Sequence, residues 1–182
     1  MGLCSSSNVK YRTNNPAHEI TCPEGALRVK PGLNSLSKAV TEAKESRFPE
    51  GIDCLFLENG VHDEKGEVVT IDFALKVVGQ NRDDVKIRAG LKIEGKKEED
   101  VFLCDCTVTG AKRTGVFGNN GAAMHLKNVC VEKCGSNGVF VNSTKRNTMT
   151  DCSVNNNQTS GVEVCFDGCI TIDGSATTIH HN

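Results

Sequence analysis

Two aspartates with an asparagine midway between them are the strongest catalytic candidates in the chain. Asp105, Asn128 and Asp151 follow one another at 23-residue intervals. If segments of that length stack as strands ~4.8 Å apart, Asp105 and Asp151 lie roughly 9.6 Å apart, near the ~6.5–9.5 Å of an acid and base pair in an inverting glycosidase. The same spacing fits a ladder of short side chains that cap backbone groups in turns. Because only Arg82, one period earlier, adds a cation to this column, we favour the ladder.

A second column at the same interval contains Glu94, Phe117, Phe140 and Glu163. These residues alternate with small and apolar ones, so we expect them to point outward from their strands. Aromatic faces stack on sugar rings, and carboxylates accept hydrogen bonds from hydroxyl groups. Glu94 and Glu163 would lie roughly 14 Å apart, which is too far for an acid and base couple. The column therefore predicts a ligand-binding surface; the alternative is that the N-terminal tail or a partner covers the two Phe rings.

The N-terminus carries an acylation pattern. Gly2 follows Met1, and Ser6 occupies the position at which the N-myristoylation pattern favours serine or threonine. Cys4 lies beside Gly2, where palmitoylation commonly follows. One myristoyl chain binds membranes only marginally, so a second acyl group at Cys4 would make the attachment stable. We therefore expect a tether to the cytosolic face of a membrane; the alternative is an ordinary flexible tail.

Composition excludes several other classes of function. The formal net charge of −2 offers no basic surface for nucleic acid. No apolar run reaches the length of a membrane span, and the N-terminus lacks the apolar core of a secretory signal, so we expect the chain in the cytosol with its ten cysteines reduced. These cysteines form no Cys-x-x-Cys pair, and His180 and His181 have no ligand partners at suitable spacing. We expect neither a metal nor a cofactor.

The 23-residue repeat predicts a stack of strand-turn coils. Residues 103–108 align with 126–131 and 149–154, and residues 115–118 align with 138–141 and 161–164. In each Val-x-Val segment the first valine should face inward, so that Val116, Val139 and Val162 form one core column. One period earlier, Ile93 and Val85 should extend the apolar columns. The period is too short for helix-pair repeats, and the leucine-rich signature is absent.

These patterns divide the chain into three parts. Residues 1–26 form a tail, residues 27–50 form a cap that includes a helix at 34–46, and residues 51–182 form the coils. The helix would cover the first coil. Its apolar residues recur at helical spacing: Leu36, Ala39, Val40 and Ala43. The last coil is incomplete at Asn182. We therefore expect end-to-end self-association through this open coil, or a chain that is one piece of a longer solenoid.

From residue 34 onward the chain resembles the pectin lyase-like superfamily of right-handed parallel β-helices. The resemblance lies in the helix, the strand 52–61 with its Gly-Val turn, and the strands 68–71 and 75–79. It implies an all-β solenoid of 23-residue coils and, by analogy, carbohydrate as a ligand of the outer strand face. The sequence departs from the polysaccharide-cleaving members, since it contains neither their Asn-x-Asp, Asp-Asp and Gly-His-Gly series nor an Arg-x-Pro-x-Arg motif.

We therefore predict a non-catalytic recognition or scaffold module, similar to the β-helix repeats of some F-box and signalling proteins. It would bind a protein or a carbohydrate on its outer strand face. The alternative is a polysaccharide hydrolase or lyase that uses Asp105 and Asp151. The two hypotheses differ in whether these carboxylates open onto a groove or lie inside a hydrogen-bonded turn.

Overall fold

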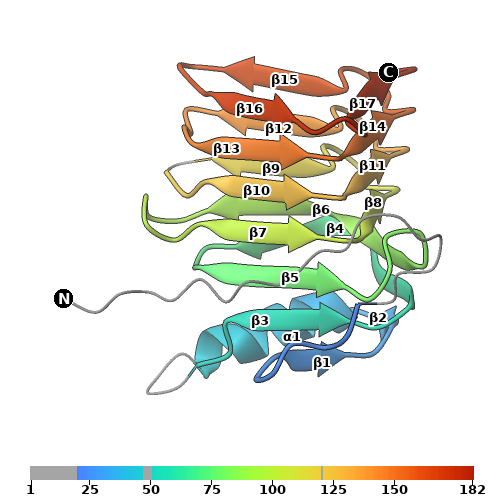
Figure 1. Ribbon diagram of the computed structural model, residues 1–182, viewed down its shortest axis with the longest axis vertical. Helices are drawn as coiled ribbons and strands as arrows, with labels where there is room; N and C mark the ends of the chain where they lie inside the picture. The colour runs from blue at the N-terminus through green and yellow to red at the C-terminus, as the bar shows by residue number, and fades with distance from the viewer. Residues whose placement is uncertain (1–19, 47–50, 120) are drawn as a thin grey trace.

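The protein is a parallel β-solenoid in which the chain winds upward through stacked coils (Figure 1). The computed structural model describes residues 20–46, 51–119 and 121–182. One face is a seven-stranded parallel sheet, here called sheet A. From the first coil to the last it contains β1 (Leu27–Val29), β3 (Cys54–Leu57), β5 (Leu75–Gly79), β7 (Val101–Cys104), β10 (Met124–Lys127), β13 (Asn147–Thr150) and β16 (Ile170–Asp173).

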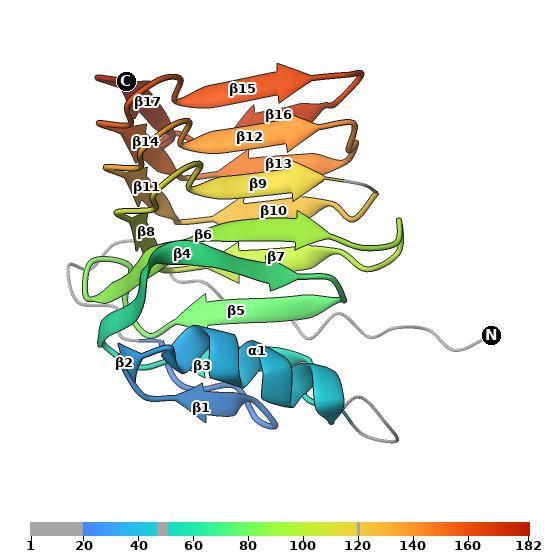
Figure 2. The ribbon, with the colours of Figure 1, turned by 180° about the vertical axis from the view of Figure 1, so that it is seen from behind.

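The other faces belong to a ten-stranded sheet, sheet B, that divides into two limbs (Figure 2). Its base contains β2 (Gly32–Leu33), β4 (Gly60–Ile71) and β6 (Val85–Glu94). One limb continues through β9 (Val116–Asn119), β12 (Val139–Asn142) and β15 (Val162–Cys165). The second limb continues through β8 (Thr107–Thr109), β11 (Cys130–Glu132), β14 (Ser153–Asn155) and β17 (Thr178–His180). The predicted fold class is thus confirmed.

The core is built from columns of small and branched side chains, as the repeat predicts. Val139 pairs with Val116 below it and with Val162 above it. Val116 and Val139 are fully buried. Equivalent columns contain Cys106, Val129 and Cys152, which are all fully buried. Each coil is therefore stabilised mainly by the apolar side chains of the coils next to it.

The predicted register is wrong below β9. Lys92, not Glu94, pairs with Phe117, and Glu94 pairs with Asn119. Ile93 likewise pairs with Gly118 instead of Val116. In the second limb Ile87, not Val85, pairs with Val108. In the first limb the longer loop between β6 and β7 sets Lys92 and Phe117 25 residues apart. In the second limb Ile87 and Val108 are only 21 residues apart, because β6 is one continuous strand, whereas residues 110–115 separate β8 from β9.

The one helix among the described residues, α1 (Ser35–Glu45), packs against β1 and β4 at the N-terminal end of the stack (Figure 2). Its buried residues are the four predicted ones: Leu36, Ala39, Val40 and Ala43. The residue before the helix, Asn34, makes no side-chain cap. Instead, Glu64 Oε1 accepts hydrogen bonds from the backbone N–H groups of Leu36 (2.9 Å) and Ser37 (3.2 Å). A buried carboxylate from β4 thus satisfies the start of α1.

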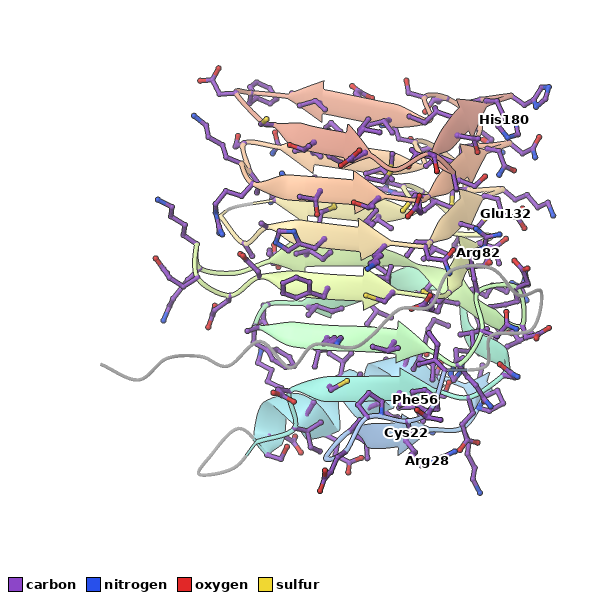
Figure 3. All side chains as sticks on the ribbon, in the orientation of Figure 1. Cys22, Arg28, Phe56, Arg82, Glu132 and His180 are labelled. Atoms are coloured by element: carbon purple, nitrogen blue, oxygen red, sulfur yellow. The ribbon has the colours of Figure 1, made fainter. Side chains whose placement is uncertain are left out.

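A second apolar cluster lies on the outer face of sheet A. It consists of Cys54, Phe56, Val78 and Cys104, against which Ile20, Cys22 and Ala26 pack. Arg28 lies over the Phe56 ring, with its guanidinium 5.5 Å from the ring centroid (Figure 3). The described N-terminal segment therefore covers sheet A, and it does not cover Phe117 or Phe140 on sheet B.

The final coil leaves core-type side chains exposed. Val164, Ile172 and Ile179 are each more than two-fifths exposed, whereas Val141, the residue beneath Val164, is fully buried. Among the described residues, no helix is both long enough and apolar enough to cross a membrane.

Candidate functional site

The first candidate site is a column of outward side chains on β6, β9, β12 and β15. We call Lys92, Phe117, Phe140 and Glu163 the outer strip, because each pairs in register with the next. All four are partly exposed. The strand-turn repeat positions them, since the residues on either side of each one point into the core.

The two Phe rings of the strip stack on each other. Their centroids are 5.2 Å apart and their planes differ by 15°. In this offset arrangement each ring covers part of one face of the other. The strip therefore presents a narrow apolar ridge, made of the edges of the two Phe rings and of the two ring faces that point away from each other. It does not present two fully open ring faces.

Polar side chains run beside the ridge. Glu94 Oε2 accepts from the Lys92 ammonium at 2.6 Å. On the next two coils, Asn142 Nδ2 donates to Asn119 Oδ1 at 2.8 Å, while the buried Asn142 Oδ1 has no partner among the described residues. The ridge is therefore flanked by an ion pair at its lower end and by an amide pair along its middle.

Glu163 forms the upper end of the strip. Its Oε2 accepts a hydrogen bond from Asn137 Nδ2 at 2.7 Å, and its Oε1 accepts from the Cys165 thiol at 3.5 Å. Burial and the nearby Glu163 carboxylate raise the pKa of the Cys165 thiol. None of the ion pairs found among the described residues involves Glu163.

The second candidate site, the column of Asp105, Asn128 and Asp151, lies at the sharp corner after sheet A. All three residues have left-handed backbones, with φ of 53°, 51° and 52°. Asn128 Nδ2 donates to Asp105 Oδ1 at 2.7 Å, and Arg82 donates to Asn128 Oδ1 at 3.1 Å. One coil higher, Asp151 Oδ1 accepts from the backbone N–H of Ala176 at 3.3 Å. Asp105 and Asn128 thus form a hydrogen-bonded pair, and Asp151 caps a backbone N–H of the coil above; we call these three residues the corner ladder.

Asp105 is only 5% exposed, and its Oδ2 has no partner among the described residues. Burial raises the pKa of this carboxyl, although Asn128 and the nearby cations oppose the shift. The carboxyl thus points into the corner and not toward a groove that would admit a polysaccharide.

The model of the right-handed β-helix region matches residues 50–182. The chain belongs to this family. No curated protein and no solved structure matches the chain at a significant level. The family establishes the architecture of the β-helix but assigns no ligand or activity to its side chains.

A third cluster, which our sequence analysis missed, lies on the outer face of sheet A. His125 stacks on Phe102 with ring centroids 4.5 Å apart, and its Nδ1 lies 2.9 Å from Thr148 Oγ1. Its Nε2 lies 3.4 Å from Asp100 Oδ2. Arg146 donates to both oxygens of Asp100 at 2.7 and 2.8 Å. The 23-residue spacing of Phe102, His125 and Thr148 was the available signal.

This third cluster has the order hydroxyl, imidazole, carboxylate that activates nucleophiles. Burial opposes ionisation of Asp100, but Arg146, the Ala123 N–H and His125 hold its pKa below the usual value. Thr148, however, lies in β13, which pairs with β10 and β16 on its two sides. The backbone N–H groups of β13 are therefore bonded within the sheet, so they cannot form an oxyanion hole beside Thr148.

The remaining features lie away from the outer strip and the corner ladder. Shallow hollows lie along α1 and are lined by residues such as Lys38 and Asp72, with no residue of the outer strip. No group of three or more side chains suited to metal binding occurs in the part of the chain that the structure describes. Gly2 and Cys4 lie outside the described residues.

Proposed function

We propose that the β-helix is a non-catalytic recognition module that binds a protein partner along the outer strip. The observation that carries the proposal is the Phe117–Phe140 stack on the solvent side of sheet B. Outward positions of a half-buried sheet are ordinarily polar, and an apolar ridge with a polar border is typical of a protein interface. Aromatic residues also supply most of the binding energy of many interfaces.

The shape of the ridge favours a protein over a carbohydrate. Sugar rings pack best on open aromatic faces, whereas Phe117 and Phe140 partly cover each other. Ring edges and an adjoining row of amides suit apolar and backbone groups of a polypeptide better. Carbohydrate binding on the same strip is the competing outcome of the test below.

The corner ladder supports a non-catalytic role. The two aspartates that best fit a glycosidase spacing are separated by Asn128, which donates to one of them, and the other caps a backbone N–H. A general acid or base must reach a proton of the substrate, and Asp105 is almost completely buried.

Site-specific crosslinking tests the proposal. A photoreactive phenylalanine analogue at position 140 should capture a discrete protein from cell extract, and the same analogue at Thr171, exposed on sheet A, should not. The captured protein is then purified and its Kd is measured. The double variant Phe117→Ala/Phe140→Ala should weaken binding at least tenfold, since truncation of interface anchors costs about 2 kcal/mol or more. The matched control is Phe102→Ala, which removes an exposed Phe of sheet A.

Two results would contradict the proposal. Equal affinity of the double variant and the wild type would remove the outer strip from the interface. Binding to a glycan array that the double variant loses and Phe102→Ala retains would establish the carbohydrate alternative.

Acylation of Gly2 and Cys4 is a separate part of the proposal, and it would place the module on the cytosolic face of a membrane. Mass spectrometry of the N-terminal peptide from eukaryotic cells tests it, since an unmodified Gly2 and Cys4 would exclude the tether. End-to-end association through Val164, Ile172 and Ile179 remains a further proposal. Sedimentation of the 182-residue chain over a range of concentrations tests it, and a monomer throughout would exclude it.

A further inference from the structure

The two ends of the outer strip differ in charge. Below the stacked rings, Phe117 pairs with Lys92, whose ammonium is bound to Glu94. Above them, Phe140 pairs with Glu163. The lower end thus contains a ring, a cation and a carboxylate, whereas the upper end contains a ring and a carboxylate.

Phe140 is partly exposed on the solvent side of sheet B. Phe117 covers part of its lower face, and the ring makes no other aromatic contact among the described residues. The next side chain in the column is Glu163 itself, which is partly exposed. An aromatic face beside a carboxylate attracts a cation through both the ring quadrupole and the negative charge.

The Glu163 carboxylate is held in place but retains capacity to accept hydrogen bonds. Asn137, only 8% exposed, donates to one oxygen, and the Cys165 thiol donates to the other. A carboxylate offers about four lone-pair positions, so about two remain for a ligand. The described residues supply no cation to it, as the ion pairs above show.

We propose that the upper end of the outer strip binds an arginine side chain of the protein partner, with the guanidinium between the Phe140 ring and the Glu163 carboxylate. The inference rests on the proposed recognition function and specifies the chemistry of the partner. A guanidinium fits better than an ammonium, because its planar group stacks on a ring while its N–H groups donate to a carboxylate. The partner supplies at this end the cation that Lys92 supplies at the other.

A titration with a small probe tests the inference without the partner. N-acetyl-arginine amide is added to the isotope-labelled chain, and backbone amide shifts are followed by NMR at constant ionic strength. N-acetyl-citrulline amide, which has the same shape but no charge, is the control ligand. We expect saturable shifts in β12 and β15 with the arginine probe only.

The variant Glu163→Gln should weaken arginine binding about fivefold, the effect of about 1 kcal/mol typical of a partly exposed cation site. Its side-chain oxygen still accepts from Asn137, so the fold is retained. Glu132→Gln, on the other limb of sheet B, is the matched control and should bind like the wild type. Equal shifts with citrulline, or no loss in Glu163→Gln, would overturn the inference.

The failure of this inference can be told apart from failure of the proposed function. If Phe117→Ala/Phe140→Ala abolishes partner binding while Glu163→Gln affects neither the partner nor the arginine probe, the arginine site is wrong and the recognition function stands. If the double variant leaves partner affinity unchanged, the recognition function itself is wrong.

Discussion

Asn128 donates its side-chain amide to the Asp105 carboxylate of the coil below, at 2.7 Å, and both residues occupy the left-handed corner of their coils. This bond leaves Asp105 Oδ2 buried without a partner among the described residues. A buried acceptor without a hydrogen-bond donor lowers the free energy of unfolding by about 1–3 kcal/mol, and by more when it is charged. The corner ladder therefore contains one rung that destabilises the fold at neutral pH.

The first prediction concerns this rung. Asp105→Asn should increase the free energy of unfolding at pH 7 by about 1–2 kcal/mol, because it removes a buried charge and keeps an oxygen for Asn128. Burial raises the pKa of Asp105 above its ordinary 3.8, so the folded state favours the protonated form. The penalty is therefore present above the folded pKa and disappears as the pH falls toward 3.8.

Urea unfolding of the wild type and Asp105→Asn at several pH values measures this effect. The difference between the two proteins should be largest at neutral pH and shrink in acid. Asp151→Asn is the matched control, since Asp151 is partly exposed and caps a backbone N–H. A variant that is less stable than the wild type at pH 7 would show that the Asp105 charge stabilises the corner.

The fold was predictable because the repeat is exact over three coils. Between β9 and β15 each valine lies 23 residues from its neighbour in the core, so counting alone predicts the pairing of Val116, Val139 and Val162. The register below β9 was not predictable, because an inserted loop shifts a strand without changing its alternation. Ile93 and Glu94 still point inward and outward, respectively, but each pairs with a residue two positions further on.

The third cluster escaped prediction for another reason. Its loop residues also follow the repeat, since Asp100 lies 23 residues from Ala123 and 46 residues, or two periods, from Arg146. They lie outside the Leu-to-Val and Gly-Val segments that mark the coils in the sequence, so the repeat motif itself does not include them. The N-terminal segment over Phe56 has no such period, because its contacts join the beginning of the chain to sheet A.

The second prediction concerns the start of α1. Glu64→Ala should lower the free energy of unfolding by about 2–3 kcal/mol, since the N–H groups of Leu36 and Ser37 lose their shared acceptor at the positive end of the helix. Glu67→Ala, which removes an exposed carboxylate paired with Lys112, should cost less than about 1 kcal/mol. Denaturant unfolding compares the two variants. Equal losses would show that Glu64 contributes only a surface charge.

The third prediction is a pH dependence at the same end of the stack. His62 is fully buried between Ser35 and Glu58, and burial lowers its pKa below 6.5 even though its bond to the Glu58 carbonyl opposes the shift. The unfolded chain therefore binds a proton more readily than the folded one. The resulting stability is complete above pH 6.5 and is lost as the pH falls below it, by at most about 1.4 kcal/mol per pH unit.

Unfolding free energies of the wild type and His62→Gln between pH 7.5 and 5 test this dependence, with pH values chosen on both sides of the ordinary pKa of about 6.5. The wild type should lose stability more steeply than the variant. His180→Gln, which removes an exposed imidazole of β17, is the control and should retain the wild-type slope. Parallel curves for the wild type and His62→Gln would exclude His62 as the source.

The fourth prediction compares two valines that pair directly in the stack. Val141 in β12 is fully buried, and Val164 above it in β15 is 42% exposed, although both occupy the same inward position of the coil. Val141→Ala should cost about 2 kcal/mol, because it removes two methyl groups and leaves a cavity between coils. Val164→Ala should cost less than about 0.5 kcal/mol, because much of its side chain already contacts water.

Urea unfolding at low protein concentration measures both losses. If Val164→Ala costs as much as Val141→Ala, the last coil is covered in solution, and repeating the comparison over a range of protein concentrations would show whether a second copy of the chain covers it.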